Sequence, residues 1–207
     1  RLGITYPEIY EMQIRAVFEA TAELVKKKAN VKPQIMIPQI SSISELNHIK
    51  KIYDVIKSEM EKKHKVKLGI NFGTMLEVVR ACLTSDELVK TAEFFSFGTN
   101  DLTQAVFSFS REDAEGKFLP EYMEKELLET SPFQSIDKNG VGDLMKIAIS
   151  QGRAHKKDLE IGICGEHGGD PYSIKFCHSA SISYVSASPH RIPIAIVAAA
   201  QAAINQK

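Results

Sequence analysis

The chain has 207 residues, of which 43% are hydrophobic and 25% are charged, and this composition suits one globular domain with a sizeable core. Its 26 basic and 26 acidic residues give a formal net charge of zero, so its charge offers no support for nucleic-acid binding. No apolar run approaches the ~20 residues that a membrane span needs, and the first residues resemble neither a signal peptide nor a transit sequence.

The first part of the chain predicts two helices around a short strand. Apolar residues at helical spacing after Pro7 predict a helix that ends in the lysine-rich residues 26–28. Residues 34–38 are mostly apolar and contain a closing proline, which predicts a strand. Ser42 and Glu45 form a capping-box pattern ahead of apolar residues at steps of three and four, so we expect a long helix there.

The middle of the chain contains the strand on which the predicted site depends. The elements expected before it are a strand over residues 66–72, a loop over 73–77, a helix up to Leu83 and a short helix after Ser85. Nearly every position in residues 94–97 is apolar, which is typical of a parallel strand covered on both faces. Gly98 ends this strand, and a helix is expected from Leu102 onward.

The second half is irregular before the alternation returns. Residues 108–140 show one helical piece near residues 122–128, and an insertion of this length is often functional. The elements expected after it are a helix around residues 144–148, a strand over 159–164, a glycine-rich loop over 165–170, a helix from Pro171 to about Cys177, a strand over 182–186 and a final helix after Pro189.

Five strands thus alternate with helices, and every connection is long enough for a parallel crossover. The fold class is therefore α/β, either a (β/α) barrel or an open doubly wound sheet. A full (β/α)8 TIM-type barrel takes ~250 residues, so five units in 207 residues predict the C-terminal part of such a barrel. We expect residues 1–207 to be a single domain that forms this part of the barrel.

Polar side chains follow three of the predicted strands, at Glu77, at Asn100 with Asp101, and at Cys164. Because strand ends converge in a barrel, these side chains are expected to share one site. Glu77 and Asp101 offer the hard oxygen ligands that Mg²⁺ prefers. The alternative for both is helix capping, through a Thr74–Glu77 capping box and an ordinary acidic N-cap.

The residues between the central strand and its helix suit an anionic ligand. Gly98 allows a ligand to approach the backbone, and the free N–H groups at the helix start face that ligand. Cys164 carries a thiol with a pKa near ~8.5, so it is mostly protonated at pH 7 and can donate a proton. The alternative for Cys164 is a small buried apolar side chain.

Two further residues have open interpretations. His167 lies in the glycine-rich loop, where it could transfer protons or bind phosphate. The alternative, which is more common for a lone histidine, is a structural role within the loop. Arg111 either reaches an anionic ligand or forms a surface ion pair. The three cysteines, Cys82, Cys164 and Cys177, lack metal-site spacing, which is typical of a reducing compartment. We expect a cytoplasmic location, and a plastid or a glycosome also agrees with the sequence.

Three segments resemble the C-terminal domain of the phosphoenolpyruvate-utilising enzymes, and the likeness extends over nearly the whole chain. They are Gly-Thr-Met-Leu-Glu at residues 73–77, Phe-Phe-Ser-Phe-Gly-Thr-Asn-Asp-Leu-Thr-Gln at 94–104 and Gly-Ile-Cys-Gly-Glu-His-Gly-Gly at 162–169. The Cys-Gly-Glu-His-Gly-Gly form favours the dikinase branch over phosphoenolpyruvate synthase and enzyme I of the sugar phosphotransferase system. The family usually has Ile-Pro where this chain has Val78-Val79.

The resemblance implies a (β/α)8 barrel that binds pyruvate or phosphoenolpyruvate together with Mg²⁺. The residues that match the family's substrate-binding positions are Glu77, Gly98, Thr99, Asn100 and Asp101. Glu77 and Asp101 also match its metal ligands, and Cys164 matches the acid that protonates the enolate carbon of pyruvate. Arg111 matches a phosphate-contacting arginine of the enzyme I branch.

For the whole enzyme, the resemblance implies interconversion of ATP, phosphate and pyruvate with AMP, pyrophosphate and phosphoenolpyruvate, through a phosphohistidine on another domain of the same chain. It also implies a homodimer and further barrel strands in the same larger multidomain enzyme. Because residues 1–207 form only part of the barrel and offer few cations for an anionic substrate, we expect this part alone to be inactive. The net charge and the hydropathy of the chain indicate no nucleic-acid or membrane partner. The alternatives are a related enzyme, either phosphoenolpyruvate synthase or enzyme I, and a non-catalytic dimerisation module.

Overall fold

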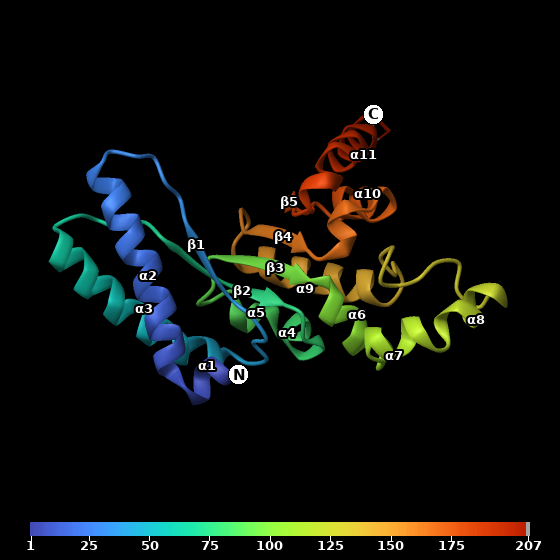
Figure 1. Ribbon diagram of the computed structural model, residues 1–207, viewed down its shortest axis with the longest axis horizontal. Coiled ribbons are helices and arrows are strands. Elements are labelled where there is room, and N and C mark those ends of the chain that lie inside the picture. The colour runs from blue at the N-terminus through green and yellow to red at the C-terminus, as the bar shows by residue number, and fades with distance from the viewer. Residues whose placement is uncertain (206–207) are drawn as a thin grey trace.

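A five-stranded parallel sheet forms the centre of the computed structural model, which describes residues 1–205 (Figure 1). The strands, in spatial order, are β1 (Gln34–Ile37), β2 (Asn71–Leu76), β3 (Phe94–Gly98), β4 (Glu160–Cys164) and β5 (Tyr184–Val185). All four pairings are parallel, and the spatial order is the chain order. A doubly wound sheet reverses its strand order at a switch point, so the sequential order favours the barrel type of α/β fold.

Helices connect the strands and cover the sheet. They are α1 (Leu2–Thr5), α2 (Pro7–Lys26), α3 (Ile43–His64), α4 (Val79–Leu83), α5 (Ser85–Leu88), α6 (Thr99–Phe107), α7 (Arg111–Gly116), α8 (Leu119–Glu124), α9 (Val141–His155), α10 (Pro171–Ser179) and α11 (Ile192–Ile204), with short 3-10 turns η1 (Glu166–Gly169) and η2 (Pro189–Arg191). Figure 1 shows α2 beside α3, α9 beside α4 and α5, and α10 and α11 together at the C-terminal end. Within residues 1–205, no helix has the length and apolar character that crossing a membrane requires.

Sequence features explain why these elements form where they do. The Ser42 hydroxyl accepts a hydrogen bond from the Glu45 N–H, and the Glu45 carboxylate accepts one from the Ser42 N–H, so the predicted capping box starts α3. Every residue of β3 is buried, as its uninterrupted apolar run predicts. The main core, between the sheet and the helices, includes Phe72, Phe95 and Ile163, all fully buried.

The position of the second strand was predicted wrongly. Residues 66–72 were expected to form it, but β2 begins at Asn71 and continues through the predicted loop to Leu76. Gly73 lies inside β2, where the Phe94 ring of the neighbouring strand packs against it. A Cβ atom at position 73 would lie 2.5 Å from atoms of that ring, so the packing requires a glycine. The ladder to β1 and β3 therefore decides the position of β2, and local composition does not.

The insertion between β3 and α9 is more ordered than its sequence predicts. The helical piece expected over residues 122–128 is instead α8, which begins at Leu119 with a proline in its first turn and stops before Glu126, where φ is 56°. The unpredicted α7 precedes it. The Phe109 ring lies 5.3 Å from the Phe118 ring and 5.9 Å from the Phe133 ring, so the insertion has a small apolar core of its own.

Three smaller boundaries also differ from prediction. α6 starts at Thr99 rather than Leu102, β5 contains two residues where five were predicted, and a short helix, α1, precedes Pro7.

The close packing at Gly73 leads to a stability prediction. Gly73→Ala should destabilise the fold by about 1–3 kcal/mol, because the new methyl group overlaps the Phe94 ring. Gly69→Ala is the matched control, since no atom lies within 4 Å of a Cβ at that position, and it should change stability by less than about 0.5 kcal/mol. Urea denaturation followed by circular dichroism measures both. Equal stabilities of the two variants would contradict this account of β2.

Candidate active site

The carboxyl ends of β2, β3 and β4 bring three predicted site residues together. Glu77 directly follows β2, Asp101 lies in the first turn of α6 after β3, and Cys164 is the last residue of β4. The register pairs Gly98 with Cys164, and the Glu77 side chain lies against Gly98. An open pocket of about 500 Å³ at this edge of the sheet has Glu77 and Asp101 in its lining.

Glu77 is an ionisable side chain that is almost fully buried, with 5% of its surface exposed. Its Oε1 atom accepts a hydrogen bond from the backbone N–H of Gln39 at 2.7 Å. Burial raises the pKa of Glu77 from 4.5 to about 7, the Gln39 N–H opposes this shift, and the adjacent Asp101 carboxylate adds to it. Asp101 therefore lies close enough for its charge to disfavour ionisation of Glu77.

Neither carboxylate caps a helix. The N-cap of α4 is Val78, without a side-chain cap, and Thr74 lies inside β2, where its hydroxyl donates to a β1 carbonyl at 3.0 Å. The N-cap of α6 is Gly98, again without a side-chain cap. The capping interpretations of Glu77 and Asp101 are therefore wrong, and neither carboxylate is used at the start of a helix.

Gly98 leaves the space that the Glu77 side chain occupies. A Cβ atom at position 98 would lie 2.5 Å from Glu77 Oε2 and 2.6 Å from Met75 Sδ. Any larger residue would displace the carboxylate, so this glycine is required for the approach of the two strand ends as well as for the predicted approach of a ligand.

Cys164 is half-buried, with Sγ 3.5 Å from the backbone carbonyl of Phe97. Burial raises the pKa of the Cys164 thiol, a hydrogen-bonding contact with Ser96 lowers it, and the charges of Glu77 and Asp101 raise it further. The group therefore stays a neutral thiol at pH 7. Burial raises the pKa of the other two cysteines, Cys82 and Cys177, to about 12.

The side chain of Thr99 is directed to the loop after β4. Its hydroxyl lies 2.7 Å from His167 Nδ1 and 3.1 Å from the Cys164 carbonyl. His167 Nε2 lies 2.9 Å from the Pro132 carbonyl, which can only accept, so Nε2 carries the proton. Burial lowers the pKa of His167, which keeps the ring neutral. His167, in the turn after β4, thus joins this turn to the start of α6 and to the insertion, in agreement with its structural interpretation.

Asn100 makes a similar contact, because its Oδ1 accepts a hydrogen bond from the Glu166 N–H at 3.4 Å. Arg111 forms an ion pair with Glu115 at 3.1 Å, and its guanidinium lies 5.6 Å from the centre of the Phe133 ring. The structure therefore favours the surface ion pair for Arg111.

Sequence reasoning missed several residues of this edge. Ser96 lies close to both Cys164 and Tyr184 and lowers the pKa of each. It is the one polar residue in a buried strand, and this position in the sequence could have marked it as a site residue. Arg1 and Gln104 line the pocket with the carboxylates. Arg1 has no recognisable sequence signal, whereas Gln104 lies three residues after Asp101, a spacing that puts both side chains on one face of α6.

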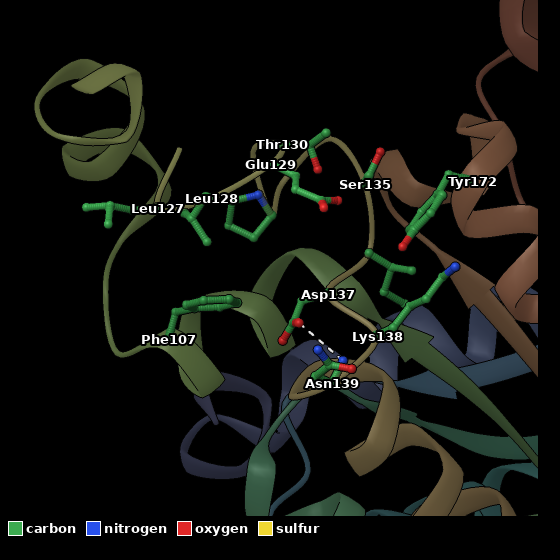
Figure 2. Close-up of a pocket in the computed structure, with 12 residues that line it drawn as sticks. Phe107, Leu127, Leu128, Glu129, Thr130, Ser135, Asp137, Lys138, Asn139 and Tyr172 are labelled. Atoms are coloured by element: carbon green, nitrogen blue, oxygen red, sulfur yellow. Dashed lines mark hydrogen bonds between the residues drawn. The ribbon is translucent and has the colours of Figure 1, made fainter. Parts of the chain in front are cut away.

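A second pocket of about 500 Å³ lies between the insertion and α10 (Figure 2). Figure 2 shows Leu127 and Leu128 on one side and Tyr172 on the other, with Lys138 beneath; the Lys138 Nζ atom lies 3.5 Å from the centre of the Tyr172 ring. The side chains of the candidate site are absent from its lining, so we treat this pocket as separate.

The donor set at the candidate site fits a hard divalent cation. In the described part of the chain, no cluster of three or more His, Cys, Asp or Glu side chains could hold a metal alone. Two carboxylates are sufficient for Mg²⁺, which keeps waters and takes substrate oxygens as its other ligands.

The raised pKa of Glu77 predicts a pH dependence of stability in metal-free protein. Between pH 4.5 and 7 the folded state holds a proton that the unfolded chain has released, so stability should fall as pH rises through this range. The fall is up to about 3 kcal/mol, and Glu77→Gln should remove it. Calorimetry with a chelator present measures this. Identical pH profiles for the wild type and Glu77→Gln would mean that Glu77 titrates normally.

The chain is similar over its whole length to part of several pyruvate, phosphate dikinases. It is 52% identical to the pyruvate, phosphate dikinase of Entamoeba histolytica over 99% of this chain, and 48% identical to that of Clostridium symbiosum over 100% of it. It is 51% identical to the chloroplastic pyruvate, phosphate dikinase 1 of Arabidopsis thaliana over 99% of this chain. The matches cover 23%, 24% and 21% of those proteins, so the chain spans about a quarter of their length.

A solved structure agrees with the fold. A citrate lyase from Burkholderia xenovorans superposes with a TM-score of 0.51 at 13% identity, over 80% of this chain and 48% of that one. At this identity the likeness shows the fold alone. The family described as PEP-utilising enzyme, PEP-binding domain, matches residues 1–204. The chain therefore belongs to the PEP-utilising enzymes and corresponds to their PEP-binding domain.

Proposed function

We propose that this domain binds pyruvate and phosphoenolpyruvate within a pyruvate, phosphate dikinase. The whole protein would interconvert ATP, phosphate and pyruvate with AMP, pyrophosphate and phosphoenolpyruvate, through a phosphohistidine on another domain. The observation that carries the proposal is the meeting of Glu77, Asp101 and Cys164 at one edge of the sheet. The identity of about 50% to dikinases supports the choice of reaction.

Mg²⁺ is the proposed cofactor, held by Glu77 and Asp101. Two adjacent carboxylates, one of them buried, repel each other when both are ionised, and a cation removes that repulsion. When bound, the cation supplies positive charge that stabilises an enolate oxygen. The remaining contacts with the anionic substrate come from the free N–H groups of α6, beginning at Thr99.

Cys164 is the proposed acid and base. Its thiol is half-buried and neutral, so it can give its proton to the methylene carbon of enolpyruvate, which becomes the methyl group of pyruvate as the enolate oxygen becomes a carbonyl. In the reverse direction the thiolate takes that proton back. The Cys164 Sγ atom lies 3.5 Å from the Phe97 carbonyl, and the Ser96 side chain lowers the pKa of the thiol against the effect of burial.

One observation favours the dimerisation alternative as a second role. On α11, Ile194, Ile196 and Val197 each expose at least half of their surface, so this helix presents an unpaired apolar face. The implied homodimer would cover it. If the domain serves only for dimerisation, the full-length protein should assemble but form no phosphoenolpyruvate. If the protein is an enzyme I, it should phosphorylate a carrier protein without forming pyrophosphate.

Removal of either proposed metal ligand should abolish turnover in the full-length protein. The assay follows formation of phosphoenolpyruvate and pyrophosphate from pyruvate, ATP and phosphate. Glu77→Gln and Asp101→Asn should each lower kcat by at least about 100-fold, because the developing enolate charge loses its stabilisation. Glu121→Gln, at an exposed carboxylate on α8, is the control and should be neutral. Near-normal turnover in both site variants would exclude the metal site.

Removal of the thiol should block proton transfer and leave the nucleotide reaction intact. Cys164→Ala should slow exchange of the pyruvate methyl protons with solvent by at least about 100-fold, the usual contribution of general acid–base catalysis. Phosphorylation of the histidine by ATP should continue, since it uses other domains. Proton NMR in deuterated water follows the exchange, and Cys177→Ala, at a buried cysteine on α10, is the control. Retained exchange would remove Cys164 from the mechanism.

A further inference from the structure

We propose that Gln104 is a positioning residue that fixes the Asp101 carboxylate for metal binding, an inference that rests on the proposed function. Gln104 lies three residues after Asp101 on α6, so both side chains lie on the same face of the helix. Its Nε2 atom donates a hydrogen bond to Asp101 Oδ1 at 3.1 Å. Both residues line the pocket that contains Glu77.

A second contact fixes the orientation of the Gln104 amide. Its Oε1 atom accepts a hydrogen bond from the backbone N–H of Arg111 at 2.8 Å. A backbone N–H can only donate, so the amide oxygen must face Arg111 and the NH₂ group must face Asp101. Between Gln104 and Arg111 the chain reverses its direction at Ser108, where φ is 59°. The Phe109 N–H donates a hydrogen bond to the Gln104 carbonyl at 3.2 Å and closes this turn. The donor is therefore held in place before any ligand binds.

The chemistry of an amide suits this task. Asp101 is exposed, so its carboxylate would otherwise be free to rotate. A neutral donor restrains Oδ1 without cancelling the negative charge, whereas a lysine or arginine at this place would compete with the metal ion. Glu77 is restrained in the same way, with one oxygen held by the Gln39 N–H at 2.7 Å. Each carboxylate thus has one oxygen fixed by a neutral N–H donor, which is the usual arrangement behind metal-binding carboxylates.

The competing explanation is that Gln104 only anchors α7. Ser110 separates the two explanations. It also lines the pocket, but its hydroxyl caps α7 by accepting the Asp113 N–H at 3.3 Å, whereas the hydrogen bond to Asp101 comes from Gln104. Ser110→Ala therefore loosens α7 and leaves the Asp101 contact unchanged. If anchoring alone matters, Ser110→Ala and Gln104→Met should have similar effects.

The test measures Mn²⁺ binding to the full-length, nucleotide-free protein by electron paramagnetic resonance of the free ion, and needs no catalysis. Gln104→Met keeps the chain length and removes both hydrogen bonds, and Gln104→Ala is a second variant in case the first folds poorly. Both should raise the Kd for Mn²⁺ at least about tenfold, as expected for loss of an outer-shell contact. Ser110→Ala should stay within about twofold of wild type.

Asp101→Asn supplies the reference for the site itself. Loss of Mn²⁺ binding in Asp101→Asn, together with a tenfold weaker Kd in the Gln104 variants, supports the proposal. Wild-type affinity in both Gln104 variants, with binding lost in Asp101→Asn, overturns the positioning role and leaves the metal site intact. An equal loss in Ser110→Ala also overturns it. Wild-type affinity in Asp101→Asn removes the proposed metal site and the positioning role with it.

Discussion

Two carboxylates lie side by side at the carboxyl edge of the parallel sheet, and the rest of the site is arranged around their mutual repulsion. Glu77 is buried at the end of β2, with its side chain packed against Gly98, and Asp101 approaches it from the first turn of α6. Burial and the neighbouring charge raise the pKa of Glu77 to about 7. Such a pair is costly without a cation. Burial raises the pKa of the nearby Cys164 thiol, the charges of Glu77 and Asp101 add to this shift, and the thiol therefore stays protonated, as a proton donor requires.

Rigidity at this edge comes from contacts that join the loops to one another. His167 is buried between Thr99, the first residue of α6, and Pro132, in the insertion. The insertion is also bound to α10, where the Ser173 hydroxyl accepts the Ile136 N–H at 2.9 Å. These bonds join three segments that are distant in the sequence. A site that must hold a small substrate in one geometry needs such hydrogen bonds between its surrounding segments, because the strand ends alone do not fix the residues that follow them.

The sequence predicts the architecture and the strand-end carboxylates well, for physical reasons. Uninterrupted apolar runs and long crossovers identify parallel strands, and parallel strands place their ends at one edge. The position of β2 could not be predicted, because the Phe94 ring that covers Gly73 comes from a neighbouring strand. Gln104 differs, because it lies three residues after Asp101 and helical spacing was a local signal for their contact. Ser96 resembles Gly73, because its neighbours Cys164 and Tyr184 belong to other strands. Long-range contacts of this kind leave little trace in local composition.

If a divalent cation and the enolate of pyruvate meet between Glu77 and Asp101, both should be visible in a crystal structure of the full-length protein with Mn²⁺ and oxalate, a planar dianion that mimics the enolate. We expect an anomalous peak within ~2.3 Å of an oxygen atom of each carboxylate, with oxalate completing the coordination close to Cys164. A peak elsewhere, or oxalate bound away from the carboxyl ends of β2 and β3, would contradict this expectation.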